Sequence, residues 1–125
     1  RLGFLHYRKG KFKEAEGYYQ KSIALDPAFE QALKGLAELY ASVKRENEAM
    51  KVLRQLTVIN PENSDPYYNI ACLYARQNNI GESLAWLQKA IDKGFSNENM
   101  LKTDKDLEPI RTTEAYRMLL KRFDQ

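Results

Sequence analysis

Apolar side chains return every three or four residues along most of the chain, which is the spacing of one helix face and not the alternation of a strand. Polar joints interrupt this pattern and divide it into segments of about four turns each. The helices predicted in this way span residues 28–42, 46–59, 65–77 and 80–93. Asp65 and Pro66 predict a helix start, with Asp65 as N-cap and proline at the first helical position. Gly94 and Phe95 predict a helix end, with the glycine in the left-handed conformation.

The pattern also repeats with a period of 34 residues, and such a period indicates stacked helical hairpins. The positions in register are Leu2, Leu36 and Ile70; Gly3, Ala37 and Ala71; His6, Tyr40 and Tyr74; Ala15, Ala49 and Ser83; and Tyr19, Leu53 and Leu87. Pro27 and Pro61 close the first two units, and Phe95 takes that place in the third. Two antiparallel helices can cross closely only where the side chains are small. We therefore expect the small positions to mark the crossing within each hairpin.

These residues resemble the tetratricopeptide repeat family, whose 34-residue unit carries a large residue, Leu, a small residue and Tyr on its first helix. The second unit matches through Leu33, Leu36, Ala37 and Tyr40, and the third unit has Tyr67 as its first large residue. The resemblance covers about residues 1–95. It implies an all-α fold, a right-handed superhelix (solenoid) of three helical hairpins, with the first helices lining a concave side.

The domain organisation expected from this period is three repeats, followed by a different C-terminal segment. The repeats would span 1–29 (a truncated first repeat), 30–63 and 64–95, and a capping segment would span 96–125. An apolar set in that segment predicts a cap with one buried and one polar face: Leu107, Ile110, Tyr116, Leu119, Leu120 and Phe123. Thr112 or Thr113 can cap its final helix. The run from Asp104 to Arg111 is similar to the close of many bacterial arrays of the family, so we expect further repeats before Arg1.

Composition argues against a nucleic-acid-binding protein and against a membrane-spanning protein. The 125 residues carry a net charge of +3 with both signs mixed along the chain, which gives no basic patch for a nucleic acid. No apolar run is long enough to span a membrane. We expect a soluble protein. The cytoplasm is slightly favoured, and the sequence otherwise leaves the compartment open.

Residues with catalytic or metal-binding chemistry are few. His6 is the single histidine and takes a core ring position, and Cys72 is the single cysteine, which we interpret as a small apolar residue. Asp104, Asp106 and Glu108 lack the glycine and distal glutamate of a calcium loop, and we interpret them as solvated charges. We expect no enzyme activity, no metal and no cofactor.

The function expected from the resemblance is protein interaction, with a peptide segment of a partner bound on the concave face. The predicted contact residues lie on the first helix of each unit and have no packing role in the pattern. They are Phe4, Tyr7, Arg8, Lys34, Glu38, Tyr68, Asn69, Cys72 and Arg76, with Gln31 and Gly35 on the same helices. Tyr68 and Asn69 stand out, because Tyr67 already fills the core position and an amide suits a peptide backbone.

Other functions stay open beside this one. Repeats of this kind can be a non-catalytic appendage that positions substrate for an enzyme domain outside this sequence. An RNA-binding pentatricopeptide array is disfavoured by the period of 34 and the closing prolines. Docking of chaperone tails is not expected, because Phe4, Gly35 and Asp65 occupy positions of the clamp that this docking needs. Self-association through the truncated first hairpin, with Phe4, Leu5 and Phe12, is a further possibility.

Overall fold

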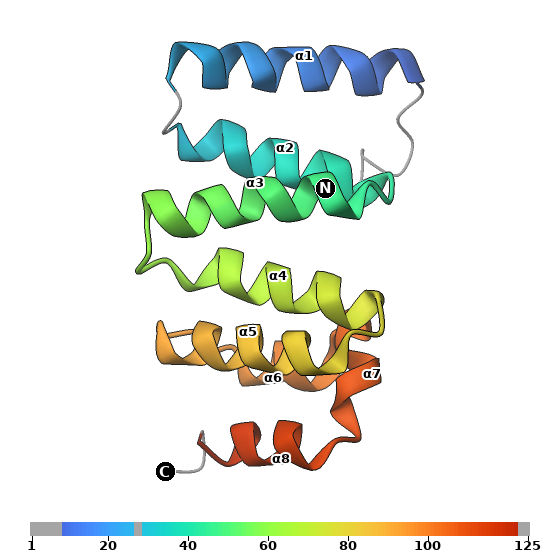
Figure 1. Ribbon diagram of the computed structural model, residues 1–125, viewed down its shortest axis with the longest axis vertical. Helices are drawn as coiled ribbons and strands as arrows, with labels where there is room; N and C mark the ends of the chain where they lie inside the picture. The colour runs from blue at the N-terminus through green and yellow to red at the C-terminus, as the bar shows by residue number, and fades with distance from the viewer. Residues whose placement is uncertain (1–8, 27–28, 123–125) are drawn as a thin grey trace. The chain divides into compact units, whose positions relative to one another are not determined.

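The computed structural model describes residues 9–26 and 29–122, and within these residues the chain forms helices and turns without a strand (Figure 1). The chain divides into two compact units, Arg1–Asn60 and Pro61–Gln125, which we describe one at a time. The predicted all-α class is confirmed. None of the helices in the described ranges combines the length and the apolar character that crossing a bilayer requires.

Unit one contains three helices that pack in chain order, α1 (Lys9–Leu25) on α2 (Glu30–Ser42) and α2 on α3 (Glu46–Ile59). The bounds of α3 agree with the predicted helix, whereas α2 begins two residues later than predicted. The core lies along one side of α2 and α3, at the spacing that the sequence pattern gives. Its buried residues include Leu33, Leu36, Leu39, Tyr40, Val52, Leu53 and Leu56.

A polar and aromatic cluster holds α1 to the turn between α2 and α3. The Tyr40 hydroxyl donates to Glu16 Oε2 at 2.7 Å, and the Arg45 guanidinium lies 4.9 Å from the Tyr40 ring centroid and 5.3 Å from that of Phe12. Arg45 also donates to the Glu48 carboxylate. Burial and the Glu16 carboxylate raise the pKa of Tyr40 to about 12, so its hydroxyl keeps the proton that it donates.

The turn inside each described hairpin has one residue in the left-handed conformation, and these two residues are 34 positions apart. Lys44 has φ 64° and Asn78 has φ 62°. Asparagine tolerates this region much better than lysine does, because its short polar side chain can bond to the local backbone. The second repeat therefore carries local strain at Lys44 that the third repeat avoids.

Replacing Lys44 by asparagine should raise the free energy of unfolding by about 0.5 kcal/mol, because it relieves this strain. The reciprocal change, Asn78→Lys, should lower it by a similar amount. Urea unfolding followed by circular dichroism measures both. A Lys44→Asn protein that is less stable than the native chain would contradict the assignment of strain to this turn.

Unit two is built on the hairpin of α4 (Ser64–Arg76) and α5 (Ile80–Asp92), each within one residue of its predicted bounds. Ala71 and Ser83 are both fully buried where these helices cross. The Ser83 hydroxyl donates to the Ala71 carbonyl at 2.8 Å, so the two small positions are in direct contact. The prediction that the small residues mark the helix crossing is confirmed for this hairpin.

The start of α4 differs from the prediction. Asn63 is the N-cap, and its side-chain oxygen accepts from the Asp65 amide at 3.1 Å. Asp65 is therefore inside the first turn, where its negative charge is favourable, and Pro66 is the third helical residue. Proline is tolerated there because the first amides of a helix have no helical partner.

The C-terminal segment continues unit two after Gly94, which has φ 104° as predicted. It contains α6 (Glu98–Thr103), the 3-10 helix η2 (Lys105–Leu107), α7 (Glu108–Arg111) and α8 (Glu114–Lys121). Thr113 caps α8 by accepting from the Tyr116 amide at 3.2 Å. The predicted apolar set is placed as expected where it is described: Leu107, Ile110 and Tyr116 are buried, and Leu119 and Leu120 are partly buried. Phe123 lies outside the described residues.

Candidate functional site

The nine residues predicted to contact a peptide fall into three groups in the structure. Phe4, Tyr7 and Arg8 lie outside the described residues and stay predictions. Lys34 and Glu38 on α2, and Asn69 on α4, are exposed, as a contact residue must be. The remaining residues, Tyr68, Cys72 and Arg76, all lie against the C-terminal segment of their own unit.

Tyr68 has a packing role, and the prediction that it has none is wrong. Its side chain is only 3% exposed. Its ring stacks on that of Phe95 with a centroid distance of 4.4 Å and an interplanar angle of 8°, and its hydroxyl donates to Asp104 Oδ2 at 2.6 Å. The repeat pattern could not reveal this, because both partners lie at or beyond the point where the period ends.

Cys72 is also covered by the C-terminal segment, so its place among the contact residues is wrong for a free peptide. Its Sγ atom lies 3.9 Å from Asp104 Oδ2, and the residue is 6% exposed. Burial, and next the nearby Asp104 carboxylate, raise the pKa of the thiol well above its ordinary value. A thiol held in the protonated form is a poor nucleophile, which agrees with its interpretation as a small apolar residue.

The aspartates of the C-terminal segment are bonded within the chain, so their interpretation as solvated charges is wrong for Asp104. Besides the Tyr68 hydroxyl, Asp104 accepts from the Asp106 amide at 3.0 Å. Asp106 in turn lies 3.9 Å from Arg76 Nε. The Arg111 guanidinium donates to the backbone carbonyls of Leu101 and Asp104 and holds the same turn from its other side.

Ligand atoms of Cys72, Asp104 and Asp106 lie within 4.8 Å of one another, which is close enough for a metal ion. The Asp104 carboxylate already accepts from Tyr68 and from a backbone amide, and the thiol is protonated. These internal contacts account for the cluster as a packing contact. The expectation that the chain binds no metal stays a prediction.

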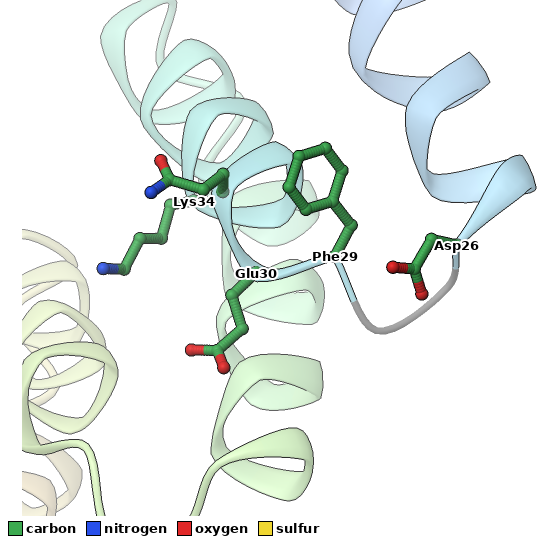
Figure 2. Close-up of a pocket in the computed structure, with 5 residues that line it drawn as sticks. Asp26, Phe29, Glu30 and Lys34 are labelled. Atoms are coloured by element: carbon green, nitrogen blue, oxygen red, sulfur yellow. The ribbon is translucent and has the colours of Figure 1, made fainter.

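A hollow of about 370 Å³ lies at the start of α2, and Figure 2 shows four of its lining residues labelled. It is lined by Asp26, Phe29, Glu30, Gln31 and Lys34. Phe29 is 39% exposed, and Figure 2 shows its ring between Asp26 on one side and Lys34 on the other, with Glu30 below. Lys34 and Gln31 were predicted from the sequence. Phe29 was missed because it precedes the repeated positions, although an aromatic residue two positions after the closing proline was a usable signal.

Gly35, on the same helix, was expected to have no packing role, and this expectation is wrong. A β-carbon added there would come within 2.4 Å of the Tyr19 ring. The glycine therefore lets the Tyr19 ring of α1 approach the backbone of α2. Its exposed neighbours Lys34 and Glu38 are left as the polar surface of this helix.

Helical hairpins with a repeated small position at their crossing define the chain as a helical-repeat protein. Two models of the family described as tetratricopeptide repeat match it, at residues 6–59 and 64–92. The chain belongs to the tetratricopeptide repeat family. The matched ranges contain both described hairpins, so the resemblance seen in the sequence is confirmed.

Two curated proteins are similar to parts of the chain. A chloroplastic protein of Arabidopsis thaliana is 34% identical over 58 residues, which are 46% of this chain and 17% of that protein. The human protein O-mannosyl-transferase TMTC1 is 34% identical over 90 residues, which are 72% of this chain and 10% of that protein. The chain thus corresponds to a small part of each relative.

Proposed function

We propose that this chain is a protein-interaction module that captures a peptide segment of a partner on the exposed face of α2. Tetratricopeptide repeats serve in general as interaction scaffolds, and the observation that supports a site on α2 is its exposed polar stripe. Gln31, Lys34 and Glu38 are exposed on a helix whose other side is buried. Their spacing of three and four residues places them on one face.

The chemistry of this surface favours a peptide of mixed charge with an apolar side chain. Phe29 offers an aromatic contact at the hollow, the Lys34 ammonium group offers a partner for a carboxylate, and Glu38 offers one for a basic side chain. Exposed ion pairs contribute little to affinity. We therefore expect Phe29 to supply affinity and the charged pair to supply orientation.

The broader prediction of a concave face that joins several repeats keeps Phe4, Tyr7, Arg8 and Asn69 as candidate contacts. Arg76 also stays a candidate because it is exposed, although its guanidinium lies 3.9 Å from the Asp106 carboxylate. Tyr68 and Cys72 leave the proposed site, because a peptide cannot reach side chains that are 3% and 6% exposed.

The test is affinity capture with the native chain and a Lys34→Glu variant as baits. We expect partners retained by the native chain to be lost or reduced at least about fivefold on the variant, which is about 1 kcal/mol for an interfacial ion pair replaced by repulsion. Binding of the recovered partner, measured with purified components, gives the same ratio.

The matched control is Lys51→Glu, which makes the same charge change at an exposed position of α3 in the same unit. Circular dichroism should show all three proteins to be equally folded. Loss of the partner with both variants would reveal a general charge effect, and retention by both would place binding away from α2.

A second function is favoured by the match to TMTC1, which is named a transferase and of which the chain spans a tenth. The repeats could be the non-catalytic appendage of an enzyme and hold a substrate near a catalytic domain. In that case a capture experiment would recover substrates of the linked domain, and removal of the repeats would raise KM and leave kcat unchanged.

A further inference from the structure

We infer that residues 95–111, which are Phe95 and the first part of the C-terminal segment, are a built-in peptide ligand of the α4 face formed by Tyr68, Cys72 and Arg76, and that they close Tyr68 and Cys72 to other peptides. The inference does not rest on the proposed function of the α2 face. It assigns to α4 a peptide-binding surface whose occupant comes from the same chain. The occupant has a defined chemistry, an aromatic residue followed by an Asp-x-Asp-Leu turn.

The three residues of the α4 face follow one another at intervals of four, so they form one stripe along the helix. Each contacts the segment through a different group. Tyr68 donates its hydroxyl to Asp104, Cys72 lies against the same carboxylate, and Arg76 lies 3.9 Å from Asp106. The residue between the two aspartates, Lys105, is exposed. The segment therefore presents Asp104 and Asp106 to the helix and leaves Lys105 on its outside, in the turn that joins α6 to η2.

Apolar contacts reinforce the polar ones. The Phe95 ring stacks on Tyr68, and Leu101, Leu107 and Ile110 are at most 1% exposed in the core that they share with α4 and α5. Burial of several large apolar side chains strongly favours the docked state. The segment is thus docked in nearly all molecules, and Tyr68 and Cys72 are not offered to a partner, whereas Arg76 stays exposed beside Asp106.

The shape of the segment is preorganised for this contact. Asp104 accepts from the Tyr68 hydroxyl with one carboxylate oxygen and from the Asp106 amide with the other. Asp104 is also the residue at which α6 ends and η2 begins. Arg111 donates to two backbone carbonyls of the same turn. A ligand that already holds its bound conformation loses less entropy on docking. The same property should let the segment bind as a separate peptide.

The test uses Cys72 as a reporter, because it is the single cysteine and the docked segment covers it. Labelling by a thiol reagent under native conditions then requires the segment to open. We expect Asp104→Ala to label about ten to a hundred times faster than the native chain, because a hydrogen bond to a charged group is lost. Tyr68→Phe removes the same hydrogen bond but keeps the carboxylate that raises the pKa of the thiol, so faster labelling of this variant reports opening alone. Lys105→Ala, an exposed change in the same turn, should label at the native rate.

A synthetic peptide of residues 95–111 separates a ligand from an ordinary piece of the core. Added at about 1 mM, the effective concentration of a flexible linker, it should slow the labelling of the Asp104→Ala chain. The same peptide with alanine in place of Asp104 should slow it much less. Should Asp104→Ala fail to fold by circular dichroism, Tyr68→Phe replaces it, because that change removes only the hydroxyl and keeps the ring stack.

Faster labelling of the opened chain and protection by the native peptide support the inference together. Native Cys72 that reacts as fast as in the urea-unfolded chain would overturn it, since the face would then be open. Faster labelling without protection by the peptide would also overturn it, because the segment would then be core structure and not a ligand. An unchanged labelling rate in the folded variant would overturn it as well, because the contact between Asp104 and Tyr68 would then contribute nothing to the docking of the segment.

Discussion

Replacing Leu107 by alanine is expected to lower the free energy of unfolding by about 3 kcal/mol. Leu107 is fully buried in η2, a single turn of three residues, and it belongs to the core that includes Tyr68, Leu87 and Ile110. Truncation removes apolar contacts and leaves a cavity that so short an element can fill only in part. Denaturant unfolding followed by circular dichroism gives the value.

The control for this prediction is Met118→Ala on α8, where the methionine is 61% exposed. A surface truncation of this kind should change stability by less than about 0.5 kcal/mol. Equal effects of the two substitutions would show that η2 is not part of the core. Equal effects would also weaken the inference that the C-terminal segment is docked on α4. Leu107 directly follows Asp104 and Asp106, the two aspartates that contact α4.

Helices α2, α3, α4 and α5 could be predicted from the sequence because their signal is local and repeated. Each apolar face recurs at helical spacing, and the period of 34 gives every position of these helices at least one independent copy. The N-cap of α4 was misplaced for a reason that is equally local. The run Asn63, Ser64, Asp65, Pro66 contains three capping residue types, and only the geometry shows which of them accepts the amide bond.

The burial of Tyr68 could not be predicted from the repeat. Its partner Phe95 replaces the closing proline of the other two repeats, and its partner Asp104 belongs to a segment without a second copy in the chain. Apolar residues of that segment were recognised, but a pattern shows that a face is buried and not what it is buried against. Tyr68, the extra tyrosine beside Tyr67, and Phe95 after Gly94 were both visible in the sequence. Their stacking on each other explains why both positions are aromatic, and the sequence does not show that they meet.

Ala71→Leu is expected to lower the free energy of unfolding by about 1–3 kcal/mol, because the added atoms have no space at the crossing of α4 and α5. Ala71 is fully buried, and its carbonyl accepts from the Ser83 hydroxyl at 2.8 Å. A larger side chain would push the helices apart and strain this bond between them. Thermal and denaturant unfolding should both show the loss.

Helix propensity cannot account for such a loss, since leucine is nearly as good a helix former as alanine. Ala85→Leu, at an exposed position of α5, makes the same change without the crossing and should be close to neutral. In unit one the equivalent positions Ala37 and Ala49 are 4% and 0% exposed, so Ala37→Leu should destabilise as Ala71→Leu does. If Ala71→Leu and Ala85→Leu were equally tolerated, the small residues would not be what sets the distance between the helices.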